Sequence, residues 1–339
     1  RDLHSFPTRR SSDLQLVERC KRIKKEAAMI LNTGSRTDIP AFFSDWLMNR
    51  VRAGFVMARN PFNARQVTRY RLDPRIVDVM TFCTKNPRPM LKHLTALAAF
   101  RIFWFVTITP YGREIEPGVP DKMRVMADFA ALSKIVGRKA VHWRYDPIFI
   151  SEKYTVAYHL RAFAQMAHLL APYTDVCIIS FIDLYRKTRR QFPEVREVTP
   201  EERIILGRKM AAITRENGML LRTCSEGTQL MNDGVDTGGC MTRRVLEKAC
   251  SIHLQVPGGK AAATRAGCDC LLGADIGAYN TCGHGCRYCY ANSDARTVAR
   301  NRACHDPGSP LLVGRPYPED QIHEADQRSW TDGQIRMVF

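Results

Sequence analysis

Three cysteines near the end of the chain have the spacing of a metal-binding loop. Cys282, Cys286 and Cys289 follow a CxxxCxxC pattern, with small residues after the first and Tyr288 just before the third. Thiolates on short loops of this kind hold iron–sulfur clusters, and a complete cubane cluster takes four ligands. Three local thiolates therefore predict a [4Fe–4S] cluster with one iron left open for chemistry.

A zinc site is the alternative interpretation of the same motif. Structural zinc takes four cysteine or histidine ligands, so His284, Cys304 or one of the pair Cys268 and Cys270 would complete it. Soft thiolates bind either metal, and the spacing favours the cluster. We expect His284 to shape the loop rather than to bind a metal.

The stretch CGHGCRYCYA, residues 282–291, resembles the cysteine motif of the radical S-adenosylmethionine superfamily, and in particular its spore-photoproduct-lyase-like branch. In that superfamily the open iron binds S-adenosylmethionine, and an electron cleaves the sulfonium to form a radical. The resemblance implies that Cys282, Cys286 and Cys289 are the cluster ligands and that Tyr288 and Asn280 contact the cofactor. It also implies an electron donor such as flavodoxin or ferredoxin.

Two features depart from that superfamily. Its cysteine motif usually follows the first strand of a barrel, whereas here the motif follows the whole series of predicted strands. This order suggests a permuted arrangement or an appended cluster loop. The chain also has no clear counterpart of the Gly-Gly-Glu stretch that holds the methionine amine.

A second group of cysteines could form another metal site. Cys268 and Cys270, together with Cys224 and Cys240, could supply four thiolates to an auxiliary cluster or to a zinc ion. Free cysteines are also common as small buried residues. Both interpretations of this group stay open.

The composition indicates a basic protein in a reducing compartment. The 339 residues include 51 basic and 34 acidic side chains, a net charge of +17, which favours an anionic partner such as nucleic acid, a nucleotide or another small anion. Runs of basic residues are nevertheless more often solvated surface than binding sites. Twelve cysteines without a secretory signal predict reduced thiols, and no apolar run is long enough to cross a membrane. We therefore expect a cytoplasmic protein with no membrane contact. The sequence does not predict its oligomeric state.

Short apolar runs alternate with amphipathic stretches along most of the chain. Residues 1–14 lack such periodicity and resemble a translated sequencing adapter, so we expect the true start upstream and exclude them. The predicted strands are residues 28–32, 55–58, 67–71, 77–83, 102–108, 140–144, 176–181 and 219–223. The predicted helices are residues 40–53, 89–99, 121–136, 156–170, 199–217 and 242–253.

Nearly every predicted strand ends in polar residues. In a βα barrel all such ends meet on one face, where active sites lie, whereas an open sheet gathers only a few. The sequence therefore predicts a TIM-type, (β/α) barrel-like domain over residues 27–230, permuted or incomplete, with a cysteine-rich segment at 231–305 and an extended tail at 306–339. The candidate catalytic residues at the barrel mouth are Arg36, Asp38, Lys85, Arg144, Asp146 and Glu226. These could instead cap helices or form ion pairs; Asp38 could be an N-cap.

Several segments together resemble the family called domain of unknown function 1848. They are Thr33-Gly34-Ser35-Arg36-Thr37-Asp38, Thr84-Lys85-Asn86-Pro87, Thr109-Pro110-Tyr111-Gly112, Trp143-Arg144-Tyr145-Asp146-Pro147 and residues 275–282. The resemblance spans about residues 29–292 and implies a carboxy-terminal cysteine cluster without a settled activity. The sequence thus predicts a radical S-adenosylmethionine-type enzyme. The alternative is a metal-stabilised nucleic-acid-binding or scaffold protein without turnover.

Overall fold

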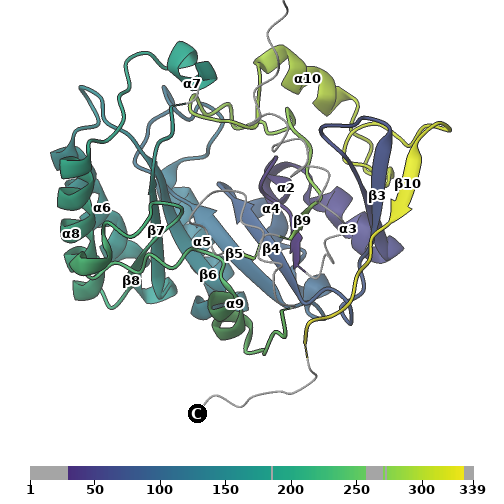
Figure 1. Ribbon diagram of the computed structural model, residues 1–339, viewed down its shortest axis with the longest axis horizontal. Coiled ribbons are helices and arrows are strands. Elements are labelled where there is room, and N and C mark those ends of the chain that lie inside the picture. Colours follow the sequence, from purple (N-terminus) through teal and green to yellow (C-terminus); the bar gives the residue numbers. More distant parts are fainter. Residues whose placement is uncertain (1–29, 185, 257–269, 272, 332–339) are drawn as a thin grey trace, which may run out of the picture.

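A computed structural model describes residues 30–184, 186–256, 270–271 and 273–331 of the chain (Figure 1). The expected adapter-like segment at residues 1–14 lies outside these ranges, as does Cys268. Within them the central feature is a seven-stranded sheet in the order β8-β7-β6-β5-β4-β1-β9, and every neighbouring pair is parallel. Its strands are β1 (Ile30–Asn32), β4 (Val79–Thr84), β5 (Ile102–Thr107), β6 (Val141–Ile148), β7 (Val176–Phe181), β8 (Leu220–Thr223) and β9 (Ala274–Asp275).

The sheet differs from the prediction in its closure. The α/β class and the parallel order are confirmed, but β8 and β9 form the two ends of the strand row, and the described residues do not close it into a barrel. Strand β9 was not predicted, because two residues are too few to show an alternating pattern. It pairs with β1 and so adds a strand from the end of the chain to the edge where the sheet begins.

Two of the predicted strands belong to a different sheet. Strands β2 (Phe55–Arg59) and β3 (Gln66–Arg71) form an antiparallel pair, and β10 (Gln321–Glu324) adds to β3 in parallel. The expectation that both belong to the parallel series was therefore wrong. The connection between them is too short for the crossover that parallel neighbours need. The polar residues that follow β2 consequently lie away from the carboxyl ends of the main sheet.

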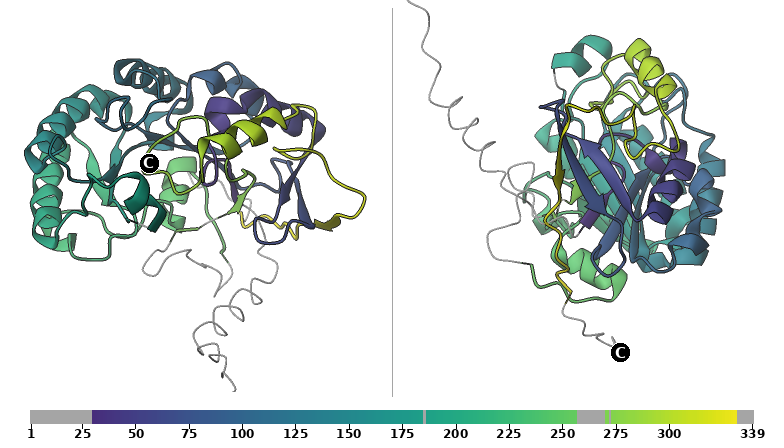
Figure 2. Two further views of the ribbon diagram at one scale, coloured as in Figure 1. Left: turned by 90° about the horizontal axis from the view of Figure 1, so that it is seen from above. Right: turned by 90° about the vertical axis from the view of Figure 1, so that its right-hand side faces the viewer.

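Helices cover one face of the main sheet in an arc, as the view from above shows (Figure 2). The predicted helix at residues 40–53 is divided in two, and that at 89–99 is a short helix followed by a 3₁₀ turn, Leu94–Leu97. No helix in the described part of the chain has the length and apolar character to span a membrane. The helices are α2 (Ile39–Phe42), α3 (Ser44–Ala53), α4 (Arg88–Leu91), α5 (Lys122–Val136), α6 (Val156–Leu170), α7 (Arg186–Gln191), α8 (Pro200–Glu216), α9 (Arg243–Cys250) and α10 (Ala295–Ala303).

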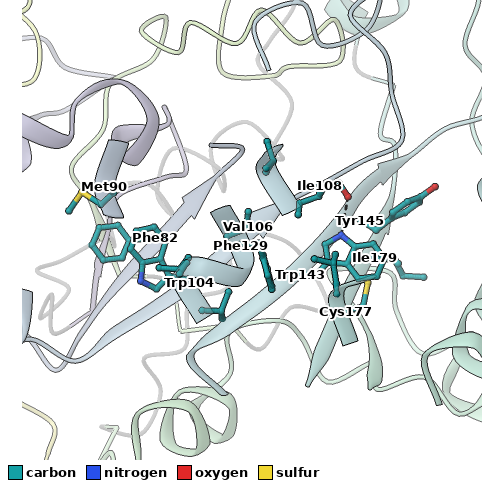
Figure 3. Packing of buried hydrophobic residues seen from close by; sticks show 14 of the residues in the cluster. Phe82, Met90, Trp104, Val106, Ile108, Phe129, Trp143, Tyr145, Cys177 and Ile179 are labelled. Atoms are coloured by element: carbon teal, nitrogen blue, oxygen red, sulfur yellow. Dashed lines mark hydrogen bonds between the residues drawn. The ribbon is translucent and has the colours of Figure 1, made fainter. Parts of the chain in front are cut away.

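Alternating side chains give the two faces of the sheet different roles. On the helix side, Phe82, Trp104 and Trp143 belong to the large core (Figure 3), and the Trp143 indole donates to the Ile108 carbonyl at 3.0 Å. On the other side, Phe103 and Phe105 pack with residues 240–256 and with α9. The carboxyl ends of the strands open beside this second face, and they position the candidate site.

Candidate functional site

A cavity of about 400 Å³ lies at the carboxyl ends of the parallel strands. Its lining joins segments that are far apart in the sequence. The loop after β9 contributes Cys282, Cys286 and Cys289, and the ends of β4 and β6 contribute Lys85 and Arg144. A second hollow, of about 590 Å³, is bordered by residues 150–157 and 193–202 and contains none of the predicted site residues. Most of the predicted site residues thus converge on the first cavity.

The cysteine loop is held closed by its own backbone and by its neighbours. The Asn280 amide donates to the Ala291 carbonyl at 2.9 Å, and the Asn292 side chain donates to the Cys282 carbonyl at 2.8 Å. Asn280 has a left-handed backbone with φ 58°, and its side chain accepts from the Ser293 amide. Asn280 therefore closes the loop and is not among the residues that line the cavity. Helix α7 lies beside the loop, because Lys187 donates to the Cys289 carbonyl at 3.0 Å.

Two thiols of this loop, those of Cys282 and Cys286, are poor nucleophiles as they stand. Burial raises the pKa of Cys286 to about 12 and raises the pKa of Cys282 well above its usual range. A metal binds the thiolate, so metal binding at this loop would release protons. Among the described residues, no three His, Cys, Asp or Glu side chains already form a group that could hold a single metal ion. The cysteine loop is therefore a candidate metal site because of the spacing of its cysteines and because all three line the cavity, not because they already form a complete set of ligands.

Glu116 links Lys85 to the cysteine loop. This buried carboxylate accepts hydrogen bonds from Lys85 Nζ and Thr109 Oγ1, both at 2.8 Å, and it also contacts Lys122 and the Tyr288 hydroxyl. Burial by itself would raise the pKa of Glu116, but the charges of Lys85 and Lys122 lower it to about 2. Sequence analysis missed Glu116. Its place in the loop after the strand predicted at 102–108 was the available signal.

Asp38 has the structural role that was left open as an alternative, and it also faces the cavity. One carboxylate oxygen caps α2 by accepting from the Ala41 amide at 2.9 Å. The other accepts from the Lys85 amide at 2.8 Å and contacts His284 Nε2 at 2.8 Å. The second ring nitrogen of His284 faces the Gly118 carbonyl at 3.2 Å. Because both ring nitrogens face acceptors, His284 is poorly placed to ligate a metal.

Arg144 and Asp146 form a buried pair on the sheet side of the cavity. Arg144 Nη2 donates to Asp146 Oδ2 at 2.8 Å, and Ser180 donates to the other oxygen of the same carboxylate. Burial would raise the pKa of Asp146, but the charge of Arg144 and the hydrogen bonds from Ser180 and Arg144 together lower it. Both side chains are therefore ionised where they line the cavity.

Two of the predicted catalytic residues, Arg36 and Glu226, lie outside the cavity lining. Arg36 pairs with Asp275 of β9 at 3.0 Å and thereby ties the loop after β1 to the strand that precedes the cysteines. Glu226 accepts from the Phe181 amide at 2.8 Å and from Arg203 at 3.0 Å, and burial raises its pKa to about 7. Both side chains support the strand ends on which the site is built.

Some of the remaining predicted metal ligands line the cavity and others do not. Cys224, Cys240 and Cys270 line the cavity, whereas Cys268 lies outside the described residues. Cys304, which was considered as a zinc ligand, is exposed at the end of α10.

The family relationship agrees with the segments that build this cavity. A search of curated proteins found no match. The family described as Domain of unknown function (DUF1848) matches residues 30–291, which include β1, the strand ends that line the cavity and the cysteine loop. Because this match covers more than half of the chain, the protein belongs to the DUF1848 family.

Proposed function

We propose that this protein is an iron–sulfur enzyme of the radical S-adenosylmethionine type. Cys282, Cys286 and Cys289 would hold a [4Fe–4S] cluster at the cavity. The observation that carries the proposal is the convergence of these three cysteines with Lys85 and Arg144 on one cavity at the strand ends. A saturated cluster would not need such a cavity, whereas a cluster with an open iron does.

The position of β9 supports the resemblance to that superfamily. The cysteine motif comes late in the sequence, but it follows β9, which lies beside β1 at one end of the strand order. If the strands are numbered by their position in the sheet, starting from the β9 edge, β9 is the first strand and the cysteine motif follows it. This is the relation expected of a permuted and incomplete barrel, with the strand order of the superfamily retained around a different chain start.

The residues present fit a bound cofactor with an anionic group. When bound, the cluster supplies an electron for reductive cleavage of a sulfonium. Lys85 and Arg144 bring positive charge to the cavity, and Lys85 Nζ lies 5.5 Å from the ring centroid of Tyr288 in the cysteine loop. The hydroxyl of Thr37, which also lines the cavity, is buried without a hydrogen-bond partner in the described chain. A buried polar atom of this kind is normally paired, so a ligand oxygen or water would satisfy it.

The substrate and partners in this proposal follow from charge. A net charge of +17 favours an anionic substrate, either a small molecule such as a nucleotide or a nucleic acid. A reductant such as flavodoxin or ferredoxin would supply the electron in the cytoplasm. The alternative, a metal-stabilised nucleic-acid-binding or scaffold protein, requires no electron donor. This alternative allows either zinc or an iron–sulfur cluster, so the metal and the response of the cluster to S-adenosylmethionine together separate the two.

The decisive experiment is anaerobic purification followed by iron and sulfide analysis. We expect about four irons and four sulfides per loop site. Cys286→Ala should lose them while the protein stays folded, and Cys304→Ala, in the exposed position at the end of α10, should retain them. Electron paramagnetic resonance of the reduced protein should change when S-adenosylmethionine is added. Zinc without sulfide would overturn the proposal, and an unchanged spectrum would restrict the cluster to electron transfer or structure.

A further inference from the structure

The cavity contains a second set of sulfur atoms, separate from the cysteine loop. Cys224 follows β8, Cys240 precedes α9 and Cys270 precedes β9, so three distant segments bring them together. The sulfur of Cys240 lies 3.5 Å from that of Cys224 and 3.6 Å from that of Cys270. These cysteines border the inner face of the sheet, where they pack with Phe103 and Phe105.

We propose that Cys224, Cys240 and Cys270 bind one thiophilic metal ion, zinc in the first instance, with a fourth position open to the cavity. Two sulfur ligands of a tetrahedral zinc ion, each bound at ~2.3 Å, lie ~3.8 Å apart. The sulfur separations here are close to that distance. A cubane cluster would hold its cysteine sulfurs much further apart. Three protein ligands with an open position are the pattern of zinc sites that exchange water or substrate.

Two hydrogen-bond donors point at these sulfurs, which favours thiolate ligands over cysteines that serve only as apolar packing. The Met241 amide donates to the Cys270 sulfur at 3.2 Å, and Arg144 Nη1 donates to the Cys240 sulfur at 3.6 Å. Outer hydrogen bonds of this kind stabilise the charged form of a metal ligand. Packing alone would need neither the buried guanidinium nor the amide to point at sulfur.

A metal ion binds cysteine as the thiolate. An entering ion would displace the three thiol protons and form three metal–sulfur bonds. As the side chains stand, no three His, Cys, Asp or Glu residues in the described part of the chain form a group that could hold a metal ion, so zinc binding requires these cysteine side chains to reorient. Oxidation of Cys224 and Cys240 to a disulfide is the competing chemistry for two sulfurs this close.

The test measures zinc in chains that lack the loop cluster. In the full chain with Cys286→Ser, purified anaerobically with reductant and supplied with zinc alone, we expect one tightly bound zinc per chain. Adding Cys240→Ser should lower bound zinc at least tenfold, whereas adding Cys304→Ser should leave it unchanged. Arg144→Gln should weaken zinc affinity by roughly 10–100-fold, because it removes a donor to a ligand sulfur.

Two outcomes would overturn this site. Equal zinc in the Cys240→Ser chain would show that these sulfurs do not bind it. A Cys224–Cys240 disulfide, seen by mass spectrometry in protein kept under reductant, would assign the pair to redox chemistry instead. Because every chain carries Cys286→Ser, neither outcome bears on the loop cluster, which iron and sulfide analysis tests. Far-ultraviolet circular dichroism shows whether each chain is folded.

Discussion

Glu116 has more charged partners than any single candidate predicted from the sequence. Its side chain is fully buried and contacts two lysines, a threonine and the tyrosine of the cysteine motif. A buried carboxylate is tolerated only when its charge is balanced and its oxygens are hydrogen-bonded. Glu116 therefore acts as a positioning residue, which holds Lys85 at the cavity and binds the Tyr288 hydroxyl of the cysteine loop.

We predict that Glu116→Gln lowers the free energy of unfolding at neutral pH by roughly 3–5 kcal/mol, because it leaves two lysines without their counter-charge. The pKa of Glu116 is lowered to about 2, so its stabilising effect is fully present above its usual value near 4.5 and is lost as pH falls towards 2. Urea unfolding at several pH values measures the difference. Glu324→Gln, which removes an exposed pair with Arg69, should cost less than about 1 kcal/mol. Equal losses in the two variants would contradict this role.

Glu226 should give the opposite pH dependence. Burial raises its pKa to about 7, so the neutral side chain favours the folded state. The contribution of Glu226 to the free energy of unfolding is roughly 3 kcal/mol. It is fully present below pH 4.5 and is lost as pH rises through 7. Glu226→Gln stays neutral and should lose this part of the pH dependence between pH 5 and pH 8 in urea unfolding. A variant whose stability falls with pH as steeply as the wild type would show that Glu226 is ionised without cost.

Strand β9 is the element that places the cysteine loop. Two residues of pairing with β1 are reinforced by the Ile276 amide, which donates to the Asn32 carbonyl at 3.0 Å, and by Arg36 on Asp275. Gly273 makes the close approach possible, because a Cβ there would lie 1.7 Å from the Ile30 carbonyl oxygen. Only glycine fits this point of the chain.

Gly273→Ala should therefore displace β9 from β1 and destabilise the protein by roughly 1–3 kcal/mol, the usual cost of overpacking. The expected signature is faster hydrogen exchange of the Ile276 amide, measured by NMR or mass spectrometry, beyond what the global loss explains. Gly54→Ala is the control, since a Cβ there meets no atom within 4 Å and the cost comes from its φ of 73°. Unchanged exchange at Ile276 would mean that β9 tolerates the methyl group.

At the scale of the molecule, residues 309–324 pack against α3 and β3, which lie early in the described part of the chain. The Trp46 indole of α3 donates to the Ser309 carbonyl at 2.9 Å, and Leu311 and Leu312 are buried. Strand β10 then adds to β3 in the small sheet (Figure 2). The segment after residue 305 thus contributes buried apolar side chains as well as surface.

Leu312→Ala should lower the free energy of unfolding by roughly 2–5 kcal/mol, as expected for a fully buried leucine. Ile322→Ala, at a 46% exposed position on β10, should change it by less than about 1 kcal/mol. Thermal or urea unfolding compares the two. Similar small effects would show that the tail contributes little to the stability of the core.

Local patterns determined the α/β class, the strands β4 to β8, the capped helices and the cysteine motif, because alternation, caps and ligand spacing are properties of short segments. Tertiary contacts decided the rest. The two-residue strand β9, the transfer of β2 and β3 to a second sheet and the open ends of the strand row depend on pairing between distant segments. The cysteines Cys224, Cys240 and Cys270 were expected to form one group, but which of their sulfurs lie in contact was decided by the fold. The partners of Glu116 likewise come from distant segments, and the spacing of residues along the sequence does not encode such contacts.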